Sequence, residues 1–171
     1  MDGDEILKAS GVAKSGDDSS NIIWGTDKPD ILFGKGGDDI LHGGAGNDFL
    51  FGNTGNDTMY GGKGSDQLFG GDGNDILYGN GVDLLVGGVG DDTYRVDGND
   101  NTIVDSDGKG TVYFNGVKLG RDSVKEFNPK MVEGDLVLED QYNHTLRIED
   151  YCNGDLGITF IQEKEMGIEP R

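Results

Sequence analysis

The stretch GGAGNDFLF at residues 43–51 joins a glycine-rich turn to an aspartate and a short apolar tail. The same pattern returns as GGKGSDQLF at residues 61–69, GGDGNDILY at 70–78 and GGVGDDTYR at 87–95. The shared form is G-G-x-G-x-D-x-U-x, where U is a large apolar residue. Self-similarity at a short fixed period indicates a solenoid, in which each repeat packs on its neighbours.

The aspartate of this pattern recurs every nine residues across residues 25–95, with one step of eight. Eight copies fill the array, and their aspartates are Asp30, Asp39, Asp48, Asp57, Asp66, Asp75, Asp83 and Asp92. The U position is held by Leu32, Leu41, Leu50, Met59, Leu68, Leu77, Leu85 and Tyr94. Successive side chains of a strand point to opposite faces, so the U column predicts one inward-facing apolar row.

Two nine-residue units complete one coil, so alternate copies should stack at about 4.8 Å in two parallel sheets. We therefore predict an all-β fold, a parallel β-roll with a small antiparallel β cap at its C-terminal end. The expected regions are a polar lead-in over residues 1–24 with Trp24 as a plug, the roll over 25–95 and the cap over 96–171. Within the cap we expect a hairpin turn at Asn115-Gly116 and strands at residues 102–104, 111–114, 117–119, 136–139, 145–148 and 158–161.

The composition excludes several classes of protein. The 171 residues carry 33 acidic and 14 basic side chains, a net charge of −19. This charge excludes a general nucleic-acid binder, argues against docking on anionic lipid and implies a cationic partner. No apolar run approaches the roughly 18 residues of a membrane span, and the first 21 residues do not resemble a signal peptide. The single cysteine, Cys152, cannot form an intramolecular disulfide.

The turns contain oxygen atoms that could bind a stabilising metal ion, which a narrow apolar core alone does not provide. Glycine is costly to order, and a single leucine column provides little apolar burial to offset that cost. Glycine-rich turns let successive carbonyl oxygens converge, and the following aspartate adds a carboxylate to the same loop. An all-oxygen site of flexible geometry suits Ca²⁺ better than Mg²⁺, and Zn²⁺ would need His and Cys ligands. We therefore expect calcium binding and folding of the array to be one equilibrium.

The array resembles the RTX β-roll of proteins that leave bacteria by one-step type I secretion. The resemblance implies calcium between turns two copies apart, so that Asp39 pairs with Asp57, Asp57 with Asp75 and Asp75 with Asp92 on one edge. On the other edge it pairs Asp30 with Asp48, Asp48 with Asp66 and Asp66 with Asp83. The implied metal ligands lie in Gly34, Gly36, Gly37, Asp39, Gly43, Gly44, Gly46, Asp48, Gly52, Asn53, Thr54, Gly55, Asp57, Gly61, Gly62, Lys63, Gly64, Asp66, Gly70, Gly71, Asp72, Gly73, Asp75, Gly87, Gly88, Gly90 and Asp92.

Two copies depart from the pattern. The first has Lys28 and Pro29 immediately before Asp30, and the seventh, which contains Asp83, is one residue short. Asp30 and Asp83 are therefore weaker candidates, so that we expect about four calcium sites and at most six.

The expected function is that of a calcium-binding module that folds on meeting extracellular Ca²⁺. The stretches DSDGKGTVYFNGVKL at residues 105–119 and TLRIEDYCNGDLGITF at 145–160 resemble the region after the repeats in iron-regulated RTX proteins and hemolysin-type toxins. The resemblance implies part of a secreted toxin, bacteriocin or related exoprotein, with a type I secretion channel as a partner. The alternatives are the tail of a secreted protease, lipase or epimerase, and an adhesive β-solenoid.

The remaining candidates are interpreted as structural. We find no catalytic motif and expect no enzyme activity from this chain. His42 and His144 lack the companions of a zinc site. The Asp105–Asp107 segment is interpreted as a turn because Gly116 stands where a helix-flanked calcium loop needs Glu, and the alternative is that it binds extra calcium. The outward residues Phe33, Phe51 and Phe69 form an apolar face, and we expect the chain's own C-terminal region or another chain to cover it.

Overall fold

The computed structural model describes residues 7–8, 11, 13–98, 100–120 and 127–149, which form two sheets. The eight-stranded sheet contains β1 (Leu7–Lys8), β3 (Ile22–Trp24), β5 (Ile40–Ala45), β7 (Thr58–Lys63), β9 (Ile76–Gly79), β11 (Asp92–Val96), β13 (Gly110–Phe114) and β14 (Val117–Lys118). The nine-stranded sheet contains β2 (Ala13–Ser15), β4 (Ile31–Gly36), β6 (Phe49–Thr54), β8 (Gln67–Asp72), β10 (Leu84–Val89), β12 (Asn101–Val104), β15 (Lys130–Val132), β16 (Asp135–Glu139) and β17 (Thr145–Ile148).

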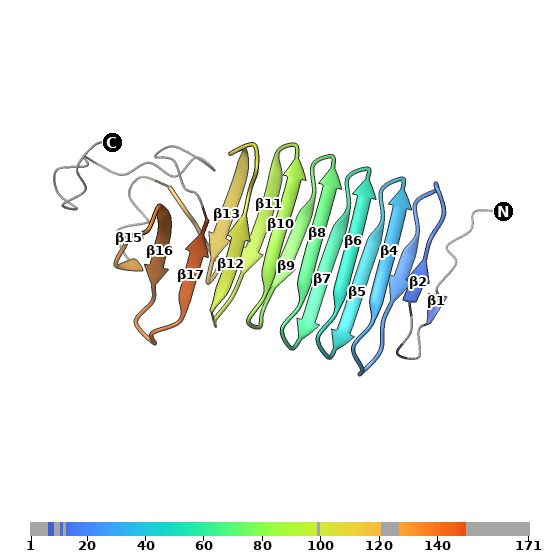
Figure 1. Ribbon diagram of the computed structural model, residues 1–171, viewed down its shortest axis with the longest axis horizontal. Coiled ribbons are helices and arrows are strands. Elements are labelled where there is room, and N and C mark those ends of the chain that lie inside the picture. The colour runs from blue at the N-terminus through green and yellow to red at the C-terminus, as the bar shows by residue number, and fades with distance from the viewer. Residues whose placement is uncertain (1–6, 9–10, 12, 99, 121–126, 150–171) are drawn as a thin grey trace.

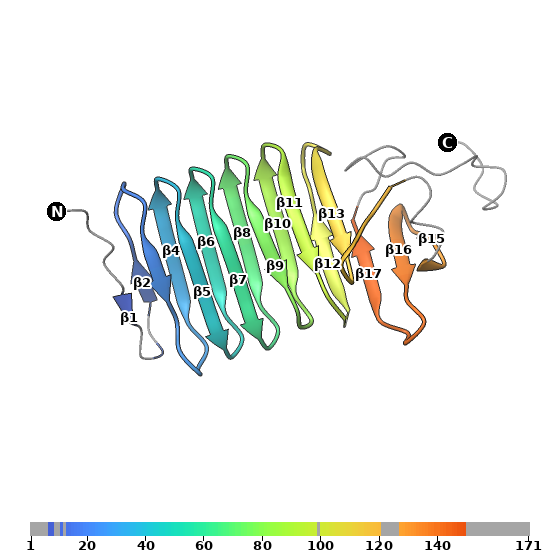
Figure 2. The same cartoon turned by 180° about the vertical axis from the view of Figure 1, so that it is seen from behind.

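The strands confirm the all-β roll. From β1 to β13 the strands alternate between the two sheets along the chain, and every neighbouring pair of these strands within a sheet is parallel. Figures 1 and 2 show the coils stacked along the long axis of the molecule, with the turns lined up along two edges. Leu32 is aligned with Leu50 and Leu41 with Met59, which is the 18-residue register expected from two nine-residue copies.

The core is the U column. All eight U residues are fully buried between the sheets, in a row that continues into further residues at both ends. Ile23 is aligned with Leu41 ahead of the array, while Ile103 is aligned with Leu85 and Val112 with Tyr94 behind it. The parallel coils therefore extend beyond the nine-residue array on both sides.

The C-terminal strands change direction after β13. The turn at Asn115-Gly116, with positive φ at both residues, folds β14 back antiparallel onto β13 as expected. Strand β17 pairs parallel with β12, whereas β16 and β15 add antiparallel strands beyond it. The expected boundary at residue 95 therefore does not coincide with the change from parallel to antiparallel pairing. The expected strand at 158–161 and Cys152 lie outside the described residues.

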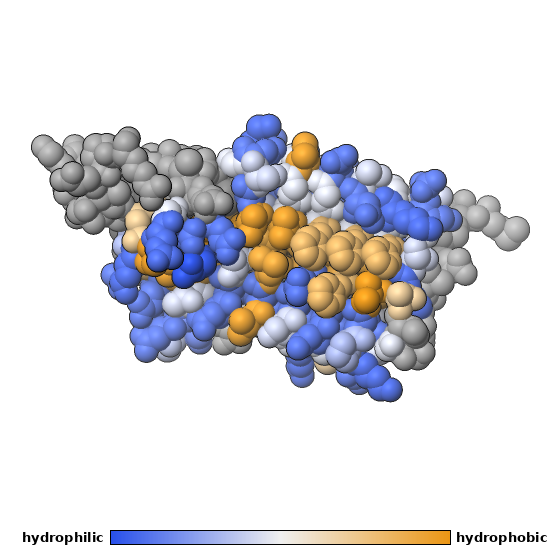
Figure 3. All heavy atoms as spheres, viewed as in Figure 1, coloured by the Kyte–Doolittle hydropathy of each residue, from blue (hydrophilic) through white to orange (hydrophobic). Residues whose placement is uncertain are grey.

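The outer faces carry stacked aromatic rings. On the nine-stranded sheet Phe33, Phe51 and Phe69 stack at centroid distances of 5.0 and 4.9 Å, within an apolar band that Figure 3 shows across the molecule. On the other sheet Trp24 stacks on His42 at 3.8 Å, and His42 on Tyr60 at 4.6 Å. Trp24 is 44% exposed and so takes a different position from the expected plug. The part of the chain that the structure describes has no helix suited to crossing a membrane.

Candidate metal centre

The turns between strands pack backbone against backbone. The fourth residue of the turn pattern is a glycine with strongly positive φ, such as Gly46 at 126° and Gly64 at 137°. A Cβ atom on Gly64 would collide with the carbonyl oxygen of Gly46 in the preceding coil. Only glycine permits both the backbone conformation and this approach, so the glycines bring the carbonyl oxygens of stacked turns together.

The repeat aspartates form two ladders along the edges of the roll. On one edge the backbone N–H of Asp39 donates to Asp57 Oδ1 at 2.8 Å, and Asp57 donates in the same way to Asp75 at 2.7 Å and Asp75 to Asp92 at 2.8 Å. The other edge has the same bonds, each 2.8 Å long, from Asp30 to Asp48, Asp48 to Asp66 and Asp66 to Asp83. The aspartates expected to act in pairs therefore lie next to each other.

The second carboxylate oxygen divides the aspartates into two groups. Six of them have a buried Oδ2 atom without a hydrogen-bond partner among the described residues, namely Asp39, Asp48, Asp57, Asp66, Asp75 and Asp92. In Asp30, Oδ2 accepts hydrogen bonds from the Thr26 N–H at 2.7 Å and the Thr26 hydroxyl at 2.9 Å. In Asp83, Oδ2 accepts the Gly81 N–H at 2.9 Å. In the two copies that depart from the sequence pattern, this oxygen therefore already accepts hydrogen bonds from its own turn.

Four of the free oxygens face a carbonyl oxygen across a small cradle. A Cβ atom on Gly34 would meet both Asp39 Oδ2 and the carbonyl oxygen of Gly52 in the next coil. The equivalent cradles are Gly43 with Asp48 and Gly61, Gly52 with Asp57 and Gly70, and Gly70 with Asp75 and Gly87. Because glycine has no side chain, each cradle stays open between two stacked turns and is lined by oxygen.

The cradle of Asp66 differs from these four. The atoms nearest to a Cβ on Gly61 all belong to Asp66, so no carbonyl of the shortened seventh copy approaches as closely. The missing residue of that copy changes the register from 18 to 17, as the alignment of Leu68 with Leu85 shows. This geometry separates the Asp66 cradle from those of its neighbours.

The free carboxylates are electrostatically costly. Burial out of water raises the pKa of Asp39, Asp66 and Asp92 to about 6 and that of Asp75 to about 7, and neighbouring carboxylates add to the shift. The pKa values of Asp48 and Asp57 shift upward for the same reason. An adjacent cation would favour the ionised form of all of these groups.

The donor set fits Ca²⁺. The described residues include no group of three or more acidic, His or Cys side chains that could hold a metal, so an ion in one of these four cradles would use backbone oxygen as well. Unpartnered carboxylate oxygens beside main-chain carbonyls provide hard ligands, which suit Ca²⁺ and not Zn²⁺. When bound, the ion would supply the positive charge that these turns lack.

Comparison with known families agrees with this chemistry. Residues 15–50 and 51–82 match the model of the RTX calcium-binding nonapeptide repeat, in four copies. Residues 15–82 are RTX repeats. The roll that they build is a structural calcium-binding module. No curated protein matches the chain.

The stacked coils include two residues that the sequence pattern did not reveal. Asn21 and Asn101 take the aspartate position at opposite ends: the Asn21 N–H donates to Asp39 Oδ1 at 2.7 Å, and Asn101 Oδ1 accepts the Asp83 N–H at 3.3 Å. Ile23 and Ile103 could have indicated these two coils, because they lie nine residues before the first U residue and nine after the last. The amide oxygen of Asn101 takes the place of a carboxylate oxygen in the hydrogen-bond ladder without adding a negative charge.

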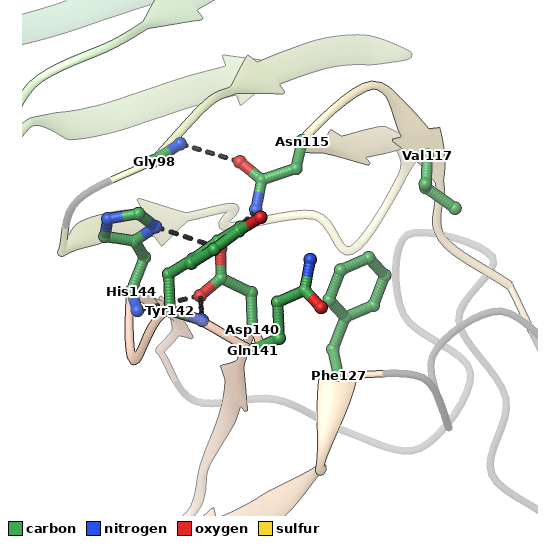
Figure 4. Close-up of a pocket in the computed structure, with 8 residues that line it drawn as sticks. All are labelled: Gly98, Asn115, Val117, Phe127, Asp140, Gln141, Tyr142 and His144. Atoms are coloured by element: carbon green, nitrogen blue, oxygen red, sulfur yellow. Dashed lines mark hydrogen bonds and ion pairs between the residues drawn. The ribbon is translucent and has the colours of Figure 1, made fainter.

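A second candidate site lies beyond the RTX repeats, in a cavity of about 520 Å³ beside the β16–β17 turn (Figure 4). Asp140 is its central polar group. Its Oδ1 accepts the N–H groups of Tyr142 and His144, and its Oδ2 accepts from Asn115 Nδ2 and lies 2.9 Å from His144 Nδ1. The carboxylate is therefore used to hold the turn and to fasten it to the end of β13, which is a structural role.

Proposed function

We propose that this chain is a calcium-dependent folding module of a protein exported by type I secretion, such as a toxin or bacteriocin. The observation that carries the proposal is the set of four cradles, each with a buried unpartnered aspartate oxygen facing a carbonyl of the next coil. The proposed ligands are Asp39 with Asp57, Asp48 with Asp66, Asp57 with Asp75 and Asp75 with Asp92, together with the carbonyls of their turns. The chain itself has no proposed catalytic role.

Repulsion within the roll makes this module sensitive to its surroundings. Stacked carboxylates repel by about 1 kcal/mol per pair at 4 Å in water, and by more as the dielectric falls. Extracellular calcium modules have dissociation constants of about 10⁻⁴ to 10⁻³ M. At cytosolic calcium the array would stay unfolded and could thread a secretion channel, and outside the cell it would fold.

We further propose that the band of Phe33, Phe51 and Phe69 is covered in the parent protein. The three rings are only partly buried, and Ile31 and Phe49 beside them are 40% and 37% exposed. The described C-terminal strands β15 to β17 lengthen the same sheet and do not lie over this face. A further segment or another chain would remove this apolar surface from water.

The test of the folding proposal is a calcium titration followed by far-ultraviolet circular dichroism. We expect little strand signal in chelator, a cooperative gain at about millimolar Ca²⁺, and little response to the same concentration of Mg²⁺. A full strand signal in chelator would show that the roll folds without metal and would overturn the proposal.

A further inference from the structure

The turn of the eighth nine-residue copy, residues 87–92, stacks on a turn that is not a repeat copy. Strands β11 and β13 align Asp92 with Gly110, so residues 105–110 form the next turn on this edge. The Ser106 hydroxyl donates to the Gly88 carbonyl at 3.1 Å, and the Gly90 N–H donates to Asp107 Oδ2 at 3.2 Å. Gly110 occupies the position of a repeat aspartate, so this turn lacks the usual carboxylate.

Asp92 nevertheless has a free carboxylate oxygen at this last pair of stacked turns. Its side chain is 1% exposed, and its Oδ1 accepts the Asp75 N–H at 2.8 Å. Its Oδ2 has no hydrogen-bond partner among the described residues and occupies the space that a Cβ atom on Gly87 would need. Asp39, Asp57 and Asp75 place their own Oδ2 atoms in the same way. The edge therefore has one more cradle than its pairs of repeat aspartates require.

A tyrosine hydroxyl lines this cradle where the others have a glycine carbonyl. A Cβ atom on Gly87 would meet the Tyr94 hydroxyl as well as Asp92 Oδ2. Tyr94 is the one aromatic U residue, and its fully buried ring spans the core to bring the hydroxyl to the edge. The hydroxyl donates to Asp105 Oδ2 at 2.9 Å.

Asp105 supplies the second carboxylate. Its Oδ1 accepts the N–H groups of Gly108 at 2.9 Å and Asp107 at 3.2 Å, which fix the orientation of the carboxylate. Among the ion pairs between described residues, none involves Asp92 or Asp105. Two carboxylates thus converge on one hydroxyl without a positive side chain to neutralise them.

We propose that this cradle is an additional calcium site, with Asp92 Oδ2, Asp105 Oδ2 and the Tyr94 hydroxyl oxygen as ligands. A phenol oxygen retains lone pairs while it donates its proton, so Tyr94 can keep its bond to Asp105 and still face the ion. The site rests on the proposed calcium loading of the RTX turns. It would extend the metal row by one ion and join the roll to the turn that follows it.

The first test compares Asp105→Asn with Asp107→Asn by isothermal calorimetry of the full chain with Ca²⁺. Both substitutions remove one charge from the same turn, but Asp107 Oδ2 already accepts Gly90 N–H and lies 3.5 Å from Lys109 Nζ. We expect Asp105→Asn to bind one ion fewer than the unaltered chain and Asp107→Asn to bind the same number. Equal stoichiometry in all three would overturn this site. Failure of the unaltered chain to bind any Ca²⁺ would instead overturn the proposed function.

The second test uses Tb³⁺, whose emission is sensitised by a nearby tyrosine. We expect calcium-displaceable emission that falls several-fold in Tyr94→Phe and stays near the unaltered level in Tyr60→Phe, whose ring lies on the outer face of β7. This measurement leaves Asp105 in place, so it holds even where Asp105→Asn fails to fold. Emission that is unaffected by Tyr94→Phe, or reduced equally by Tyr60→Phe, would overturn the site.

Discussion

A cradle aspartate can be accommodated in the roll in two ways, either protonated or beside a cation. Its Oδ1 atom accepts a backbone N–H of the preceding coil, but its buried Oδ2 atom has no hydrogen-bond donor among the described residues. Protons and calcium ions therefore compete for the same oxygen.

This competition predicts how the calcium-free chain responds to pH. Folding raises the pKa of Asp39 to about 6 and that of Asp75 to about 7 from an ordinary value of 3.8. Between the ordinary pKa of 3.8 and these raised values, the folded state binds more protons than the unfolded chain. Its free energy of unfolding therefore falls as the pH rises through this range. In chelator, we expect more strand signal by circular dichroism at about pH 5 than at about pH 8. Identical spectra at both pH values would contradict this assignment.

The two groups of aspartates predict different effects of the same substitution. In Asp57→Asn the amide oxygen can keep accepting the Asp39 N–H, as Asn101 does for Asp83, but the ionic ligand is lost. We expect the calcium affinity to fall at least about tenfold, or ~1.4 kcal/mol, in a chelator competition titration. Asp30→Asn is the control, because Thr26 already occupies the Oδ2 atom of Asp30, and it should change little. Equal losses would contradict the proposed order of sites.

Among the elements, each parallel strand contributes one buried U side chain to a core that is a single row. Most of the other side chains on these strands point outward, so a vacancy in the row cannot be filled from the same strand. The turns, in contrast, contribute backbone contacts and few apolar atoms.

The narrow core predicts a large cost for truncating one of its members. Leu68 on β8 is fully buried between the coils on either side of it, and Leu68→Ala would remove its contacts with both. We expect a loss of about 2–5 kcal/mol in urea unfolding at saturating Ca²⁺. Gln67→Ala, on the outer face of the same strand, should cost about 0.5 kcal/mol or less. A similar loss in both variants would contradict the inward row as the core.

Across the entire solenoid, stability should depend on the number of bound ions. The net charge of −19 opposes any compact state of this chain, and the turns concentrate part of that charge along two edges. Bound cations act only on the folded form, so their effect on the unfolding free energy accumulates from coil to coil.

This linkage predicts the slope of stability against calcium concentration. Above the dissociation constant, each tenfold rise in free Ca²⁺ adds about 1.4 kcal/mol per site, so four sites should add about 5.6 kcal/mol. Urea unfolding at several buffered calcium concentrations measures this slope. A slope equivalent to a single ion would contradict a row of cooperating sites.

The periodicity alone was enough to predict the coil, the inward row and the adjacency of the aspartates. A strict nine-residue spacing couples each position in the sequence to one position in the coil, so that residues 18 apart must become neighbours. The hairpin at Asn115-Gly116 was equally local, because two residues with positive φ define that turn. The pattern did not predict the coils that contain Asn21 and Asn101. Asparagine keeps the hydrogen bond of the ladder but is not the aspartate that defines the repeat.

The availability of each carboxylate oxygen, in contrast, depends on atoms that only folding brings together. Thr26 reaches Oδ2 of Asp30 because its turn bends back on itself, which the sequence pattern leaves open. Tyr94 and Asp105 are 11 residues apart and belong to a strand and a turn, so their hydrogen bond required the stacking of one coil on the next. Short-range spacing determines which backbone segments are neighbours, but side-chain reach across those neighbours is a property of three-dimensional packing.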